Sequence, residues 1–191
     1  HYPLRRQRQM CIRDSGIRDK IKLEINTLGN LESRKNYISD LVKFLKKNIS
    51  RLSSESKKKL ETNPLRILDS KNNEDKEVIE ESPKILNFLD DESNFFFEAV
   101  LNNLKKLNIE FSVNPYLVRG LDYYNDTAFE FVTFEDKSQN AILAGGRYDG
   151  LVSSLGGKNL SGVGWASGIE RIILNLKEFK IKKKIIAVSY T

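Results

Sequence analysis

Residues 117–132 read LVRGLDYYNDTAFEFV, and the last ten of them alternate in the way that predicts a β-strand. Tyr123 and Tyr124 would then point to opposite faces of the sheet, so we expect only one of them to line a binding site. Arg119 lies five residues before Tyr124, and Gly120 offers the bend or bulge that could bring both side chains to one face. The alternative is that Tyr124 is a core or rim residue of the sheet.

The strands on either side of this stretch enclose a helical block. Residues 20–26, KIKLEIN, alternate between polar and apolar side chains and predict a half-buried strand that ends in a turn at residues 27–30. Helical spacing then takes over, and residues 31–108 predict a largely helical insertion. From residue 109 the pattern returns to strands, glycines and one last helix. This order predicts an α+β fold with an antiparallel sheet.

Local signals divide the helical block. The apolar period predicts a helix over residues 32–47, and a shorter helix is expected after Ser53. Residues 63–71, NPLRILDSK, predict an ordered loop because proline cannot continue a helix. The charged, non-periodic run at residues 72–81 predicts a solvated loop, and the Ser-Pro pair at residues 82–83 predicts the start of another helix.

The arginines are few and concentrated in motifs. Only six follow residue 18, against twenty-one lysines. Three of them, Arg119, Arg147 and Arg171, lie in the motifs LVRGLDYY, AGGRYDGL and GVGWASGIER. A guanidinium group can hold a phosphate or carboxylate with two parallel hydrogen bonds, which a lysine ammonium cannot do. These arginines are therefore candidates for an anion site, with chance clustering at the surface as the alternative.

The motif AGGRYDGL follows an apolar strand. Gly145 and Gly146 would let the backbone approach a ligand closely or adopt a positive φ. Paired glycines before a Tyr-Asp-Gly sequence also make ordinary loops, and the pattern lacks the lysine and the spacing of a P-loop.

The motif GVGWASGIER predicts a strand-to-helix junction. Ser167 and Glu170 fit a capping box at the start of the last helix. Arg171 lies in the first turn, where amide donors and the helix dipole favour an anion, although a solvent-facing arginine is the alternative. The predicted buried face of this helix consists of Ile169, Ile172, Ile173 and Leu176.

Composition limits the chemistry. The chain has 191 residues, of which 39% are hydrophobic and 30% charged, and no stretch is long and apolar enough to cross a membrane. Cys11 and His1 are the only residues of their types, which excludes a disulfide framework and a zinc site. Any metal would be a hard ion held by carboxylates and substrate phosphates, which points to magnesium with a nucleotide, and no residue of the chain is singled out as a metal ligand.

The N-terminal residues look foreign to the fold. Residues 1–18 hold five arginines and one aspartate and contribute +4 of the net charge of +6, which leaves about +2 for the rest. We interpret residues 1–19 as a non-native or disordered tail, such as a sequencing artefact, with an arginine-rich targeting peptide as the alternative.

Together the motifs resemble one protein family. INTLGN, NPLRILDSK, LVRGLDYYNDTAFEFVT, AGGRYDGLVSSLGG and GVGWASGIERI occur in the order and spacing of the second half of the histidyl-tRNA synthetase catalytic domain. The resemblance covers about residues 20–178, and GVGWASGIER is similar to motif 3 of class II synthetases. It implies ATP-dependent activation of histidine to an adenylate, followed by transfer to tRNA(His).

The resemblance also implies roles for individual residues. Arg119 matches the arginine that contacts the α-phosphate and the amino-acid carboxylate, so it is the candidate catalytic residue. Tyr124 and Tyr148 match tyrosines of the histidine pocket, whereas Arg147 is left as a structural residue. The positions implied for ATP binding are Arg171, Gly145, Gly146, Gly164 and Gly168.

The same resemblance implies a domain layout. Residues 20–30 and 109–178 would belong to the catalytic domain, residues 31–108 to the insertion domain, and residues 179–191 to a linker and the first strand of an incomplete anticodon-binding domain. A cytoplasmic homodimer is expected for the full-length protein, and the segment alone is expected to be inactive because motifs 1 and 2 are missing. Insertion-domain lysines could contact tRNA phosphates, or could simply form a solvated face: Lys43, Lys46, Lys47, Lys57, Lys58 and Lys59.

Two alternatives to the enzyme remain open at this stage. One is a non-catalytic, synthetase-like regulatory subunit of histidine biosynthesis, whose members typically lose Arg119 and Arg171. The other is a general RNA-binding domain, which would need a concentrated basic face that a charge of about +2 does not favour.

Overall fold

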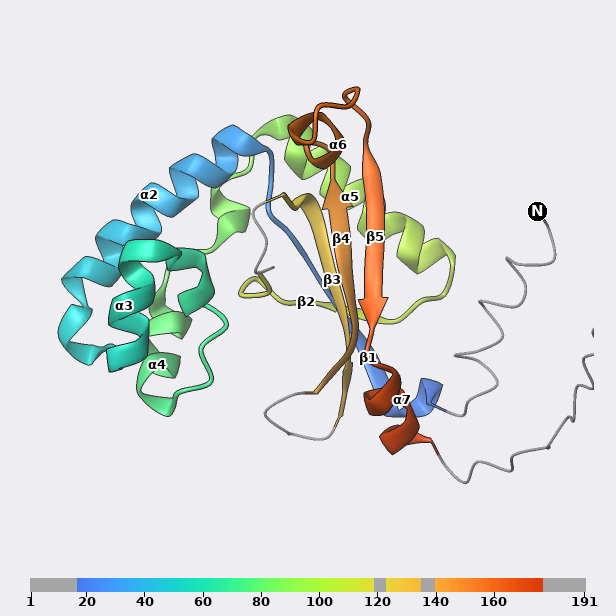
Figure 1. Ribbon diagram of the computed structural model, residues 1–191, viewed down its shortest axis with the longest axis horizontal. Coiled ribbons are helices and arrows are strands. Elements are labelled where there is room, and N and C mark those ends of the chain that lie inside the picture. Colours follow the sequence, from blue (N-terminus) through green and yellow to red (C-terminus); the bar gives the residue numbers. More distant parts are fainter. Residues whose placement is uncertain (1–16, 119–122, 135–139, 177–191) are drawn as a thin grey trace, which may run out of the picture.

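The computed structural model describes residues 17–118, 123–134 and 140–176. Five strands form one sheet in the order β2-β1-β3-β4-β5 (Figure 1). The strands are β1 (Ile21–Thr27), β2 (Phe111–Val113), β3 (Asn125–Thr133), β4 (Ala141–Tyr148) and β5 (Gly162–Ser167). The helices are α2 (Leu31–Lys47), α3 (Ser54–Thr62), α4 (Asn73–Glu81), α5 (Asp91–Lys106), α6 (Leu151–Ser154) and α7 (Ile169–Asn175). Short 3-10 turns cover Arg18–Lys20, Ile49–Arg51, Pro64–Ile67 and Ile85–Phe88. The predicted α+β fold is confirmed.

The sheet is antiparallel except at one edge. β1, β3, β4 and β5 pair antiparallel, whereas β2 pairs parallel to β1. A parallel neighbour requires a crossover connection, and the helical block between β1 and β2 supplies it. The predicted antiparallel pairing therefore holds for β1, β3, β4 and β5, and the parallel edge at β2 is a departure that the helical block makes possible.

The helices α2 to α4 form a lobe with its own hydrophobic core beside the sheet (Figure 1). Tyr37, Leu41 and Leu45 present one buried stripe of α2, at the spacing that the sequence predicts. Ser53 caps α3, as expected, by accepting a hydrogen bond from the amide of Ser56. The predicted loop at residues 63–71 begins with a 3-10 turn whose Leu65 and Ile67 are buried in the core of the lobe.

Two local predictions within the block are wrong. Residues 73–81 form helix α4 rather than a solvated loop, because Asn72 caps it and Val78 and Ile79 bury one face of a short helix whose other residues are polar or charged. Ser82 does not begin a helix; it ends α4, where its hydroxyl donates to the carbonyl of Ile79. Asp90 instead caps the next helix, α5.

A buried carboxylate organises the lobe. Asp75 of α4 is fully buried and accepts hydrogen bonds from the amide and hydroxyl of Ser53 and the hydroxyls of Ser56 and Ser70, at 2.8, 2.8, 2.7 and 2.5 Å. Burial alone would raise the pKa of this carboxyl group, but the hydrogen bonds outweigh burial and the pKa is lowered. Asp75 therefore joins α4 to the start of α3 and to the segment after the 3-10 turn.

Candidate active site

Three tyrosines form a cluster on one face of the sheet. The ring centroids of Tyr123 and Tyr124 lie 4.6 Å apart, and those of Tyr148 lie 5.8 and 6.2 Å from them. Tyr124 is buried with Leu28 and Ala128 beneath it. The expectation that Tyr123 and Tyr124 point to opposite faces is wrong, because β3 begins only at Asn125 and the two tyrosines lie in the irregular segment before it. The structure brings Tyr124 and Tyr148 together, as is needed if both line the same pocket.

Glycines in the two neighbouring strands make room for these rings. A Cβ at Gly146 would lie 2.7 Å from the carbonyl oxygen of Thr127 and 2.8 Å from the ring of Tyr124. A Cβ at Gly164 would lie 3.0 Å from the hydroxyl of Tyr148. The packing of the tyrosine cluster therefore requires a glycine at position 146, whereas a Cβ at position 164 would need the Tyr148 ring to shift by a few tenths of an ångström. The ATP roles implied for both glycines stay predictions.

We expect Gly146→Ala to weaken histidine binding about tenfold or more, because the added methyl group meets backbone on one side and Tyr124 on the other. The matched control is Gly150→Ala, whose Cβ would meet no atom within 4 Å. Isothermal titration of both variants of the full-length protein with histidine measures the difference. Equal affinities would show that the site does not depend on this packing.

The other two glycines assigned to ATP have different surroundings. Gly145 lies within β4, where a Cβ would meet Trp165 at 2.7 Å and Phe129 at 2.8 Å. Gly168 caps α7, and the nearest atoms to its Cβ belong to Arg171 at 3.4 Å or more. Contacts within the chain account for Gly145 without a nucleotide, and the ATP roles of both glycines stay predictions.

A polar cavity of about 630 Å³ lies between the sheet and the helical lobe. Glu24 of β1 and Glu130 of β3 are direct cross-strand partners in its wall. Arg171 of α7 lines the same cavity, and its guanidinium group donates to the carbonyl of Ala141 at 2.5 Å. The lobe contributes Leu68, Asp69 and Lys71. The lining therefore holds three carboxylates and two cationic side chains, and Glu24 is paired with Lys22 at 2.6 Å and accepts from the side-chain amide of Asn114 at 2.7 Å.

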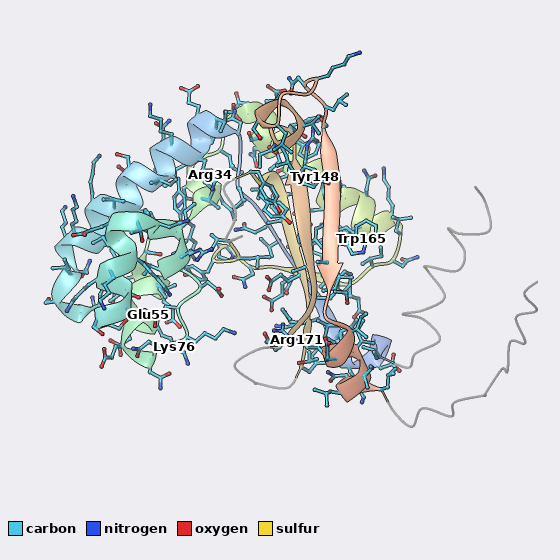
Figure 2. The ribbon with its side chains drawn as sticks, in the orientation of Figure 1. Arg34, Glu55, Lys76, Tyr148, Trp165 and Arg171 are labelled. Carbon is cyan, nitrogen blue, oxygen red and sulfur yellow. The ribbon has the colours of Figure 1, made fainter. Side chains whose placement is uncertain are left out.

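The cavity and the tyrosine cluster share one face of the sheet. Ala128, beneath the tyrosines, and Glu130, in the cavity wall, are two residues apart in β3 and so point the same way. Arg171 bonds the first residue of β4 and Tyr148 is the last, so the two ends are about 20 Å apart along the strand. Figure 2 shows Arg171 and Tyr148 at these opposite ends. A ligand that touches both must be elongated, with an aromatic-binding end and an anionic end.

The junction at α7 differs from its prediction. Gly168, not Ser167, is the N-cap residue, and the Ser167 hydroxyl donates to the carbonyl of Ile142. The predicted capping box is therefore wrong, because Ser167 is still part of β5. The predicted buried face is also wrong: Ile169 and Ile173 are more than half exposed, since α7 packs by its Arg171 side.

Arg147 lies on the opposite face of the sheet, where it makes contacts within the chain. Its Nε donates to the carboxylate of Asp149 at 2.9 Å and lies 3.7 Å from that of Asp126. The guanidinium carbon lies 4.7 Å from the ring centroid of Phe96, which belongs to α5. Arg147 therefore joins the end of β4 to the start of β3 and to the helix behind the sheet.

Arg119 and Gly120 lie outside the described residues, so the structure does not place the candidate catalytic group. Sequence reasoning missed Glu24 and Glu130 entirely. In FEFV a carboxylate interrupts an otherwise apolar strand, which was a signal for Glu130. Glu24 occupies an ordinary polar position in the alternation of KIKLEIN, and its pairing with Glu130 depends on strand order and register.

Comparison with known proteins agrees with the fold and the motifs. The chain has the fold of apo histidyl-tRNA synthetase from S. aureus, with a TM-score of 0.64 and 34% identity over 90% of this chain and 42% of that one. The enzyme from Nostoc sp. PCC 7120 shares the fold at a TM-score of 0.51 and 20% identity, with coverage of 87% and 44%.

Sequence relatives are closer. Histidine–tRNA ligases of two Wolbachia pipientis strains, wPip and wMel, are each 50% identical to the chain, which spans 43% and 40% of their lengths, and the matches cover 90% and 86% of the chain. The histidyl-tRNA synthetase family model matches residues 24–172. The chain belongs to the histidyl-tRNA synthetase family.

Proposed function

We propose that the full-length protein is a histidine–tRNA ligase, which activates histidine with ATP and transfers it to tRNA(His). The observation that carries this proposal is the elongated site on one sheet face, with three tyrosines at one end and Arg171 with two carboxylates at the other. Ligases at 50% identity support it, and they do not favour the regulatory-subunit alternative. The chain spans less than half of these relatives, so the activity is proposed for the full-length protein.

The tyrosine cluster is the proposed histidine pocket. The rings of Tyr124 and Tyr148 meet almost edge to face, and each brings one hydroxyl group to this aromatic cluster. A tyrosine hydroxyl can pair with an imidazole nitrogen and so reject side chains of similar size that lack one. Arg119, five residues before Tyr124 in the sequence, would hold the carboxylate and the α-phosphate while the carboxylate attacks in line.

The cavity is the proposed nucleotide end of the site. Arg171 would hold ATP phosphates, and its bond to the carbonyl of Ala141 keeps the guanidinium group in place before the ligand arrives. Magnesium fits this wall as a nucleotide-bound ion, because it commonly uses one or two carboxylates together with substrate phosphates, and Glu24 and Glu130 would be those carboxylates. Glu24 would exchange its present contacts with Lys22 and Asn114 for the ion. Bound there, the ion would neutralise phosphate charge. The described residues contain no cluster that could hold a metal by itself.

The remaining proposals concern the tRNA contact, the oligomeric state and the cellular location. The lobe is proposed as part of the insertion domain and as a tRNA contact. Lys46, Lys47, Lys57 and Lys58 are exposed on α2 and α3, and the ion pairs of Lys43 with Asp40 and Lys59 with Glu55 are surface pairs that bind weakly. A homodimer and action in the cytoplasm follow from the proposed function. None of the helices in the described ranges is long and apolar enough to span a membrane.

Replacing Arg119 with alanine in the full-length protein should abolish adenylate formation and leave the fold intact, because that arginine is expected to hold the two reacting groups, the carboxylate and the α-phosphate, and to stabilise the charge that develops between them. Pyrophosphate exchange into ATP is the assay, with each amino acid in turn for the unaltered protein. We expect exchange with histidine alone and none in the variant. Undiminished exchange in the variant would remove Arg119 from this role, and no histidine-dependent exchange in the unaltered protein would overturn the function.

A further inference from the structure

Arg34 joins the helical lobe to the tyrosine cluster. Its guanidinium Nη1 donates to the backbone carbonyl of Tyr124 at 2.9 Å, across ninety positions of sequence. Figure 2 shows the side chain at the end of α2 that lies next to the sheet. The contact is partly buried, and a hydrogen bond from a charged donor is among the stronger ones in proteins.

The base of the Arg34 side chain is held firmly. Asn30 caps α2 by accepting from the amide of Ser33 at 2.9 Å, and the amide of Arg34 donates to the carbonyl of Asn30 at 3.0 Å. The side chain of Asn30 also donates to the carboxylate of Asp90 at 2.6 Å, and Asp90 caps α5. The first turn of α2, which carries Arg34, is therefore fixed to a second helix, α5.

The segment that Arg34 holds lacks the support of a regular strand. Tyr124 precedes β3, whose pairing with β4 is irregular between Asn125 and Ala128. Asp126 has a positive φ of 49° and exchanges backbone hydrogen bonds with the turn at Leu28 and Gly29. The position of the Tyr124 backbone is therefore set by contacts from outside the ladder, and the bond from Arg34 is one of them.

We propose that Arg34 is a positioning residue for the amino-acid end of the site, which sets the Tyr124 ring through its backbone and makes histidine recognition depend on the helical lobe. This inference rests on the proposed function, since it assigns the histidine pocket to the tyrosine cluster. Arg34 would act through Tyr124 and not on ATP. Its loss should therefore affect histidine binding selectively.

The test compares Arg34→Ala and Arg34→Lys with Lys35→Ala, an exposed neighbour on the same turn, by histidine-dependent pyrophosphate exchange in the full-length protein. We expect Arg34→Ala to raise KM for histidine about tenfold while KM for ATP changes less than twofold. Arg34→Lys should give an intermediate KM, because lysine keeps the charge but not the planar donor group. Lys35→Ala should match the unaltered protein.

The outcomes separate the inference from the function on which it rests. If the unaltered protein shows no histidine-dependent exchange, the proposed function fails. If it shows exchange and both Arg34 variants keep the original KM for histidine, the positioning role is wrong. Equal rises in KM for both substrates would also contradict it, because that is the pattern of general structural damage. Should Arg34→Ala fail to fold, Arg34→Lys alone decides between these results.

Discussion

Replacing Arg171 with alanine should lower histidine-dependent pyrophosphate exchange about a hundredfold or more in the full-length protein. Arg171 is the arginine among the residues that line the described cavity. Removing one well-placed hydrogen-bond donor to a charged reacting group typically lowers the reaction rate by about this factor. Its bond to the carbonyl of Ala141 would also be lost, so Arg171→Lys, which retains the charge, should recover only part of the activity.

The control for this variant is Arg51→Ala, which removes an arginine from the helical lobe. Arg51 pairs bidentately with Glu81 at the surface, at 2.8 and 2.9 Å, and lies 3.7 Å from the carboxylate of Glu77. We expect this variant to keep normal exchange and to lose only a little stability, because exposed ion pairs contribute little. An Arg171→Ala protein as active as Arg51→Ala would show that the cavity is not the phosphate site.

The second large effect should be on stability. Asp75→Ala is expected to destabilise the helical lobe by about 3 kcal/mol, because three serine hydroxyls and one amide would lose a shared buried acceptor. Urea unfolding followed by circular dichroism measures this. Glu74→Ala, at an exposed neighbouring position of α4, is the control and should change the free energy of unfolding by less than about 0.5 kcal/mol.

The Asp75 carboxylate also makes the stability of the lobe depend on pH. Its pKa in the folded protein is below the ordinary value, so the stabilisation is complete above about pH 4 and is lost as the pH falls through the folded pKa. The difference in unfolding free energy between the unaltered protein and Asp75→Ala should therefore shrink below about pH 4. A difference that stays constant to pH 2 would show that the charge on Asp75 contributes nothing.

Sequence periodicity was sufficient for the elements that carry a regular apolar stripe. β1 and α2 lie where alternation and helical spacing place them, because each buries one face against a continuous core. Helix α4 was missed because two apolar residues among charges do not make a period, and only the lobe around Val78 and Ile79 reveals why it is helical. The exposed face of α7 shows the reverse case, a clear stripe that nothing in the described part of the chain covers.

The candidate site was predictable in its residue types but not in its arrangement. Motif resemblance selected Tyr124, Tyr148 and Arg171, but spacing alone placed Tyr123 and Tyr124 on opposite faces. Whether two tyrosines share a face depends on where β3 begins, and that is set by the hydrogen bonds of Asp126 with the turn after β1. The pairing of Glu24 with Glu130 likewise depends on the sheet register, which joins residues more than a hundred positions apart.

The most direct test of this account is a crystal structure of the full-length protein with ATP and histidinol, which lacks the attacking carboxylate. We predict that the imidazole ring lies against Tyr124 and Tyr148, and that the triphosphate occupies the cavity between Arg171 and the Glu24–Glu130 pair. A nucleotide bound elsewhere, or a cavity at Arg171 that stays filled with water while both ligands are bound, would contradict it.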